Sequence, residues 1–134
     1  MIKFWKKSLS NISNKAKIGN GTVIHSGVHI HDEVTIGQNC QIQANVYMPN
    51  GVTLEDNVFV GPGVMFSNDK TLEKSREEWK PMPTLVMGGA KIGMGSLIRA
   101  GVVIGEDSIV GMGSLVLDDI PSEEVWVGSP AHYL

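Results

Sequence analysis

Three of the four histidines in this sequence lie close together, and histidine is the side chain best suited to bind zinc or to accept a proton near neutral pH. His25, His29 and His31 fall in neighbouring six-residue units, whereas His132 lies far along the chain. His25 and His31 take the same position in consecutive units, so a three-sided coil would place them on different faces. We therefore expect solvent-facing or subunit-contact histidines and no metal ion, with zinc shared between subunits as the alternative.

A second group of side chains that could do chemistry is charged and lies at residues 68–83. This stretch, NDKTLEKSREEWKPMP, contains no histidine; its charged residues after Asp69 are Lys70, Glu73, Lys74, Arg76, Glu77, Glu78 and Lys80. It interrupts a regular six-residue pattern, so it must leave the repeat as a loop. A loop of this length within a compact repeat is usually functional. We favour a functional loop over a solvated insertion without a role.

The elements that position these residues follow from an apolar residue at every sixth position. The first block consists of Ile18, Ile24, Ile30, Ile36, Ile42, Met48, Leu54, Val60 and Phe66, and the second of Val86, Ile92, Ile98, Ile104, Val110 and Val116. Four positions after nearly every one of these, the side chain is small or β-branched. The residue just before that position is usually Gly or Asn, which tolerate a left-handed turn. This periodicity is typical of a hexapeptide β-helix.

We expect an all-β fold in which each unit forms one short strand and a corner. Three units would close a triangular coil, and about five coils would stack through parallel strand pairing to a height of roughly 24 Å. The β-helix domain would span residues 18–134, with the loop inserted at about 68–83. Residues 1–17 would form a separate segment.

The N-terminal segment, residues 1–17, carries five lysines and no acidic residue, with apolar side chains spaced loosely like one face of a helix. A basic amphipathic segment can bind a membrane surface. A stacked repeat also needs an atypical terminal unit that covers its exposed strand edges. We favour a short N-terminal cap and keep a weak surface anchor as the alternative.

The composition argues against several classes of protein. A net charge of −3 with 19% charged residues leaves no broad basic surface for nucleic acid. The single cysteine, Cys40, falls in a small-residue position of the repeat and predicts a core side chain rather than a disulfide or a Cys-based zinc site. No apolar run is long enough to span a membrane and no secretory signal is recognised, so we expect a cytoplasmic protein.

Familiar catalytic motifs do not occur in the sequence. There is no GxSxG elbow, phosphate-binding Gly-rich loop or HExxH. The GxG strings, such as Gly61–Gly63, are repeat corners. Asp118 and Asp119 suit a turn at the end of the repeat better than an acid and base pair. The repeat therefore predicts a fold without indicating a reaction.

The residues within individual six-residue units also resemble those of a known family. The hexads IGMGSL, IGEDSI and VGMGSL, with the ending VWVGSPA, resemble those of the bacterial hexapeptide-repeat acyltransferases over residues 18–131. The string IQANVYMPNGVTLEDNVFVGPGVMFSND, residues 42–69, followed by a charged loop and PTLVMGGAKIG, is similar to N-acetyltransferases that modify nucleotide-linked amino sugars. In particular it resembles enzymes acting on 3-amino sugars such as UDP-2-acetamido-3-amino-glucuronate.

This resemblance implies a left-handed parallel β-helix that assembles as a homotrimer, with active sites in the clefts between neighbours. Acetyl-CoA would lie along the second block as the acyl donor. The resemblance places Asn68 near the reacting amine, with Gln43 and Asn45 on the same repeat face and Arg76 of the loop as a further substrate-binding residue.

The same resemblance implies a CoA site. Positions that commonly line the pantetheine arm or its exit correspond to Ala100, Val103, Met112, Leu117 and Pro130. Arg99, next to this set, stands where relatives often have an uncharged residue.

The implied chemistry is attack of a neutral amine on a thioester, for which positioning supplies much of the rate. The loop histidine of the antibiotic and galactoside branches is missing here. Either His25 or His31 acts as base across a subunit interface, or the amine loses its proton to water. We favour the second route.

The favoured function is therefore N-acetylation of a nucleotide-linked amino sugar for surface polysaccharide synthesis. O-acetylation of a sugar or small alcohol is the first alternative, although activating a hydroxyl would require a base. The others are a γ-carbonic-anhydrase-like hydratase and a β-helix scaffold without catalytic activity.

Overall fold

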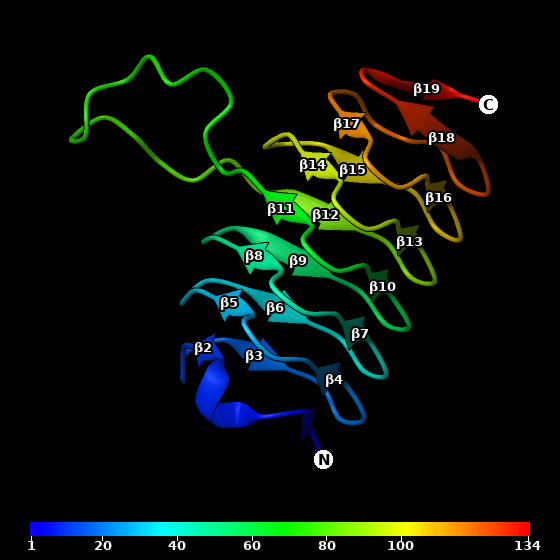
Figure 1. Ribbon diagram of the computed structural model, residues 1–134. Helices are drawn as coiled ribbons and strands as arrows, with labels where there is room; N and C mark the ends of the chain where they lie inside the picture. The colour runs from blue at the N-terminus through cyan, green and yellow to red at the C-terminus, as the bar shows by residue number, and fades with distance from the viewer.

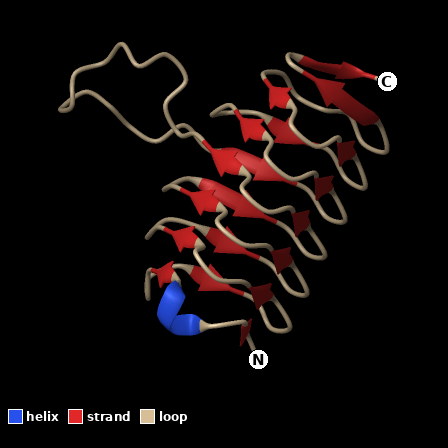
Figure 2. Ribbon diagram, in the orientation of Figure 1, coloured by secondary structure: helices blue, strands red, loops and turns tan.

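A computed structural model describes residues 1–134 as a stack of short strands, with one long loop and a single short helix (Figure 1; Figure 2). The helix, η1, is a 3-10 turn at Lys7–Leu9 beside the N-terminus. No helix could cross a membrane. The all-β character that the six-residue period predicts is therefore confirmed.

The stacked triangular coils form a three-sided prism. Its sides are three sheets, here called A, B and C. Sheet A contains β1 (Lys3–Phe4), β4 (Val23–Ile24), β7 (Gln41–Ile42), β10 (Phe59–Val60), β13 (Lys91–Ile92), β16 (Ile109–Val110), β18 (Val125–Gly128) and β19 (Ala131–Tyr133). Sheet B contains β2 (Asn11–Ile12), β5 (His29–Ile30), β8 (Tyr47–Met48), β11 (Met65–Phe66), β14 (Leu97–Ile98) and β17 (Leu115–Val116). Sheet C contains β3 (Lys17–Ile18), β6 (Thr35–Ile36), β9 (Val52–Leu54), β12 (Thr84–Val86) and β15 (Val103–Ile104).

The chain visits sheets A, B and C in turn, so each coil pairs in parallel with the coil before it and the coil after it. Ile24 lies opposite Ile42 in sheet A, and Ile30 lies opposite Met48 in sheet B. Partners are thus eighteen positions apart, which is one coil of three six-residue units. Only the terminal β18 and β19 pair antiparallel.

The stack has about seven turns, rather than the predicted five. At the N-terminal end, Phe4 lies opposite Ile24 and Ile12 opposite Ile30, so residues 1–18 form a first coil. At the other end, Ile120 bridges Ile104 and β18 pairs with β16. The six-residue count misses these coils because Phe4 and Ile12 are eight positions apart, and Val116 and Ile120 only four.

The interior of the prism is a single column of apolar side chains. All the predicted inward residues are buried except Ile18, which is half-buried at the first coil. Ile2, Phe4 and Ile12 pack against the same cluster and cover its end. The small-residue positions contain buried hydroxyls that bond locally: Ser108 and Ser114 each donate to the carbonyl three residues earlier, at 2.6 Å.

The corners turn as the Gly and Asn pattern predicts. Asn39 and Gly63, for example, have positive φ values of 57° and 71°. Three edges of the prism result, which we name after the sheets they join. The A–B edge carries residues 25–28, 43–46, 61–64, 93–96 and 111–114; the B–C edge carries 31–34, 49–51, 67–83, 99–102 and 117–119; the C–A edge carries 19–22, 37–40, 55–58, 87–90 and 105–108.

The long loop leaves the prism at the B–C edge, between β11 and β12, and projects away from the coils (Figure 1). Strand pairing continues across it, because Met65 lies opposite Leu97 and Thr84 opposite Val52. The predicted loop insertion is therefore present, and it interrupts one edge without interrupting any sheet.

Candidate active site

Asn68 lies at the foot of the loop and holds its two ends together. Its side-chain Nδ2 donates to the carbonyl of Asn50 at 3.1 Å, and its own carbonyl accepts from the Met82 N–H at 3.0 Å. The side chain is half-buried. Its Oδ1 accepts no hydrogen bond from the protein, so this oxygen is free to accept one from a ligand.

Asn50 is a residue that six-residue counting does not single out. It belongs to a column at eighteen-residue intervals along the B–C edge, made of Asn14, Asp32, Asn50 and Asn68. Asn50 Oδ1 accepts from the Glu33 N–H at 3.2 Å while its carbonyl holds Asn68. Reading the sequence by whole coils, rather than by single units, would have identified it.

The other end of the loop is fixed by Met82. A Cβ at Gly101, whose φ is +87°, would come within 2.6 Å of the Met82 sulfur. The Gly101 N–H also donates to Thr84 Oγ1 at 3.1 Å. Glycine at this corner thus lets Met82 sit over the next coil and anchors the loop.

We call the two attached ends of the loop, around Asn68–Lys70 and Met82, the loop foot. Three hollows surround it, and Lys70 lines all of them. One, of about 440 Å³, lies within the loop and is lined by Asn68, Lys74, Trp79, Lys80 and Met82, among others. A second, of about 390 Å³, lies against sheet B and has an apolar floor of Met65, Leu97, Leu115 and Leu117 beside Arg99. The third, of about 490 Å³, includes Met82, Ala100, Gly101, Leu117 and Asp119.

The charges around the first two hollows favour an anionic ligand, because basic residues outnumber acidic ones in each, whereas the third is lined by Asp118 and Asp119 beside Lys70. Neither Lys70 nor Arg99 is in an ion pair, because the single ion pair of the structure joins Lys15 to Asp32 at 3.9 Å. Asp69, next to Lys70, uses its Oδ1 to accept from the Leu72 N–H at 3.0 Å. Lys70 therefore lines the same hollow as Asn68, and Arg99 lines the adjacent one, with no protein anion bound to either cation. Phosphate is a common partner for such groups.

The predicted substrate residues do not all meet there. Gln43 and Asn45 lie on the A–B edge, so the expectation that they share a face with Asn68 is wrong within one chain. The six-residue period is the same on all three edges and does not tell them apart. Arg76 lies in the exposed part of the loop, outside all three hollows.

Neither candidate base reaches the loop foot. His25 lies on the A–B edge with its ring stacked on Trp5, the centroids 5.6 Å apart. His31 shares the B–C edge with Asn68 but lies two coils earlier, against Tyr47 at 5.4 Å. This confirms that His25 and His31 occupy different faces. No three His, Cys, Asp or Glu side chains gather as metal ligands would.

The predicted CoA-binding residues, like the predicted substrate-binding residues, do not all lie on one edge. Ala100 and Leu117 line the third hollow. Val103 lies next to it, because its N–H donates to Oδ1 of Asp119, which also lines that hollow, at 2.8 Å. Met112 lies on the A–B edge, and Pro130 lies in the turn between β18 and β19. Part of the predicted set thus lies at the loop foot, whereas Met112 lies on the A–B edge and Pro130 in the last turn of the chain.

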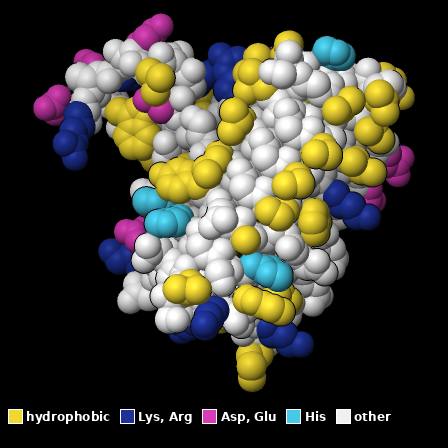
Figure 3. Space-filling model, in the orientation of Figure 1, with side chains coloured by type: hydrophobic (Ala, Val, Ile, Leu, Met, Phe, Trp, Pro, Cys, Tyr) yellow, Lys and Arg dark blue, Asp and Glu magenta, His cyan; other side chains and the backbone are white.

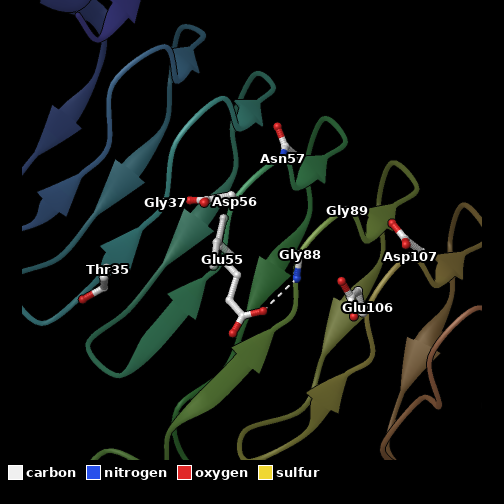
Figure 4. Close-up of a pocket in the computed structure, with 10 residues that line it drawn as sticks. Thr35, Gly37, Glu55, Asp56, Asn57, Gly88, Gly89, Glu106 and Asp107 are labelled. Carbon is white, nitrogen blue, oxygen red and sulfur yellow. Dashed lines mark hydrogen bonds between the residues drawn. The ribbon is translucent and has the colours of Figure 1, made fainter.

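A further concavity, of about 660 Å³, runs along the C–A edge and is lined by Glu55, Asp56, Glu106 and Asp107 (Figure 4). Two of these carboxylates bond to the backbone of turns: Glu55 accepts from the Gly88 N–H at 2.9 Å, and Asp56 from the Gln38 N–H at 2.7 Å. These bonds join one coil to the next. We regard this concavity as structural.

Cys40 is fully buried, as its position in the repeat predicts, and its thiol donates to the Glu55 carbonyl at 3.1 Å. Burial raises the pKa of this thiol above its ordinary value, and the charge of Asp56 acts in the same direction. The side chain is therefore a protonated core group and not a nucleophile.

The chain resembles several known proteins. It is 50% identical over 48 residues to the dTDP-3-amino-3,6-dideoxy-α-D-galactopyranose 3-N-acetyltransferase of Aneurinibacillus thermoaerophilus, a match that covers 36% of this chain and 25% of that enzyme. The structure of a hexapeptide-repeat acetyltransferase from Vibrio cholerae with acetyl-CoA is 27% identical, has a TM-score of 0.70 and covers 94% of this chain and 68% of that one.

A variant of perosamine N-acetyltransferase from Caulobacter crescentus, solved with CoA and GDP-perosamine, superimposes with a TM-score of 0.85. That match covers 99% of this chain and 57% of that enzyme, and its 24% identity shows a common fold. The match to the Aneurinibacillus enzyme spans only about a quarter of that relative.

Family models match both blocks of the repeat. The model described as bacterial transferase hexapeptide (six repeats) matches residues 15–50 and 33–68, and the model described as hexapeptide repeat of succinyl-transferase matches residues 89–118. The stacked coils, the Gly and Asn corners and these matches agree, and the chain therefore belongs to the bacterial hexapeptide-repeat transferases.

Proposed function

We propose that the protein is an acetyl-CoA-dependent N-acetyltransferase that acts on the amino group of a nucleotide-linked sugar. The observation that carries this proposal is at the loop foot, where Asn68, with its free Oδ1, and Lys70 line one hollow, and Lys70 and Arg99 line the next. The oxygen suits an amine N–H, and the cations suit phosphate groups. The likeness to an amino-sugar N-acetyltransferase and to an acetyltransferase solved with acetyl-CoA supports the same chemistry.

In the proposed reaction, Asn68 Oδ1 accepts a hydrogen bond from the neutral substrate amine and so directs its lone pair at the thioester carbonyl. The new N–C bond forms as the C–S bond breaks, and CoA leaves as a thiolate that takes up a proton. The amine proton passes to water, since no imidazole of the same chain lies at the loop foot and His25, on the A–B edge, lies two coils before the coil that carries the loop. Catalysis then depends on positioning more than on proton transfer by the enzyme.

The proposal includes a homotrimer whose sites lie between copies. Within one chain, sheet B separates the loop foot from the A–B edge that carries Gln43, Asn45 and Met112. If the A–B edge of one copy faces the B–C edge of the next, both sets of residues border one cleft. Because acetyl-CoA is the donor, the proposal also includes a cytoplasmic location.

The direct test incubates the purified protein with acetyl-CoA and a panel of UDP- and dTDP-linked amino sugars, with the matching hydroxyl sugars as controls. Released CoA is measured with a thiol reagent, and the product is identified by mass spectrometry. We expect turnover with at least one amino sugar and a mass gain of one acetyl group on nitrogen. Turnover confined to hydroxyl sugars would favour the O-acetyltransferase instead, and an inert panel would refute the proposal.

A further inference from the structure

Positive and negative charges are unevenly distributed along the chain. The whole sequence contains 11 Lys and Arg and 14 Asp and Glu. Five of the basic residues and none of the acidic ones fall within residues 1–17; these are Lys3, Lys6, Lys7, Lys15 and Lys17. The rest of the chain is therefore strongly acidic, and the N-terminal segment is strongly basic.

The fold gathers these lysines at one end of the prism. The strands β1, β2 and β3 are the terminal strands of sheets A, B and C, so the first coil has no coil beyond it within the chain. We call the surface of this coil, residues 1–18, the end face (Figure 1). All five lysines are exposed on it, and only Lys15 has an ion-pair partner.

Exposed apolar side chains accompany the lysines. Met1, Trp5 and Leu9 are 89%, 74% and 56% exposed, while Ile2 and Phe4 of the same segment pack against the core. Trp5 is held in place by its stacking on His25. Figure 3 shows hydrophobic and Lys or Arg side chains together at the lower end of the molecule, where Figure 1 places the N-terminus.

We propose that the end face docks on the surface of an anionic phospholipid membrane. Lysines near such a surface are attracted to its phosphate and carboxylate groups, and Trp and Leu side chains gain from entering the headgroup region. A uniformly acidic protein surface or a nucleic acid would match the charge but would leave the aliphatic Met1 and Leu9 against polar groups. The proposal does not rest on the enzymatic function.

The test is co-sedimentation of the full chain with vesicles. We expect binding to vesicles of equal parts phosphatidylcholine and phosphatidylglycerol, and at least about tenfold weaker binding to pure phosphatidylcholine or in high salt. Changing Lys3, Lys6 and Lys7 together to Gln should weaken binding to a similar extent. Trp5→Ala, made alone, should also weaken vesicle binding, but the dependence of binding on salt should stay as in the wild type.

A matched control removes the same number of charges from another surface. Lys70, Lys74 and Lys80 lie on the loop, and changing all three to Gln should leave vesicle binding within about twofold of the wild type. Equal losses in the loop variant and the end-face variant would overturn the proposal, as would equal binding to neutral and anionic vesicles. Circular dichroism of each variant checks that the fold is kept.

Sedimentation velocity without lipid separates the proposal from self-association. If the end face instead pairs with the acidic surface of another copy, the end-face variant would dissociate an oligomer in the absence of vesicles and would keep its lipid binding. That result would overturn the proposal. An unchanged oligomeric state together with lost lipid binding would support it.

Discussion

At the scale of the residue, Asn68 combines a structural bond with a free acceptor. Its Nδ2 donates to the carbonyl of Asn50, and its Oδ1 accepts no hydrogen bond from the protein beside the hollow within the loop. A side chain with this division of roles can orient a ligand without moving. The same residue therefore fixes the loop and presents the atom that we assign to the substrate amine.

Asn68→Ala removes both roles, and we expect kcat to fall by about 10²-fold, as for other positioning groups. Steady-state kinetics with acetyl-CoA and the preferred amino sugar would measure this. Asn50→Ala is the comparison, because it keeps the Oδ1 of Asn68 and the carbonyl that anchors it, and its loss should be much smaller. Normal turnover by Asn68→Ala would remove this residue from the mechanism.

Cys40 leads to a prediction about pH. Burial raises the pKa of its thiol, so the folded protein keeps the proton to a higher pH than the unfolded chain does. The stability that this contributes is complete below the unfolded pKa, about 8.5, and is lost as pH rises through the folded value. We expect the melting temperature of the wild type to fall above this pH more steeply than that of Cys40→Ser, whose hydroxyl does not titrate there. Parallel pH curves for the two proteins would contradict the assignment.

At the scale of the element, the loop is attached by small features rather than by secondary structure. The Asn68 bonds close its first end, and Met82 over Gly101 fixes its second. Most of the side chains between these points are exposed. The geometry of the site therefore depends on two corners of the B–C edge.

Gly101→Val tests the second attachment. A β-branched side chain would both strain the positive φ and displace Met82, so we expect KM to rise several-fold, with about 1–3 kcal/mol lost from the free energy of unfolding. Asn57→Val is a control for backbone strain, because its φ of +60° is also positive and it lies on the C–A edge, outside the proposed cleft. A similar rise in KM for both variants would show that Met82 does not anchor the site.

Strand residues were easier to predict than edges, for a physical reason. Burial demands an apolar side chain every six residues, and a left-handed corner demands Gly or Asn, so Ile42, Ile98 and Asn39 could be placed from sequence. The edge on which Gln43 lies depends on the eighteen-residue coil. The cations Lys70 and Arg99 line one hollow because the first residues of the loop lie beside β14, a placement that no periodicity in the sequence encodes.

The inward position of Ile98 can be tested directly. It is 2% exposed in the continuous core. Ile98→Asp would bury an unpaired carboxylate, and we expect a loss of more than about 4 kcal/mol and failure to fold. Ile98→Val should cost only about 1 kcal/mol. Chemical denaturation would measure both, and a stably folded Ile98→Asp protein would place this side chain outside the core.

At the scale of the whole molecule, the division of the predicted site between two edges is the main consequence of the triangular coil. Sheet B keeps the loop foot and the A–B edge apart in every copy. Neighbouring copies in a closed ring can bring different edges together, because such contacts join unlike surfaces. An active site built in this way would require assembly.

A mixing experiment tests this arrangement. Asn68→Ala damages the B–C edge and Gln43→Ala the A–B edge, so each variant alone should be weakly active. Co-expression of the two in equal amounts would give mixed trimers with one intact site out of three. Counted over all trimers, including the unmixed ones, about one quarter of the sites would be intact, and about that fraction of wild-type activity should return. No recovery in verified mixed trimers would show that each site lies within one chain.

The regular stacking of the coils has a consequence for where the reaction takes place. Two coils separate the end face from the coil that carries the loop, and each pairs only with its neighbours. With the end face on a membrane, the number of these coils would set the height of the loop foot above the lipid. Gain or loss of one eighteen-residue coil would shift that height by about 4.8 Å while leaving every pairing surface intact.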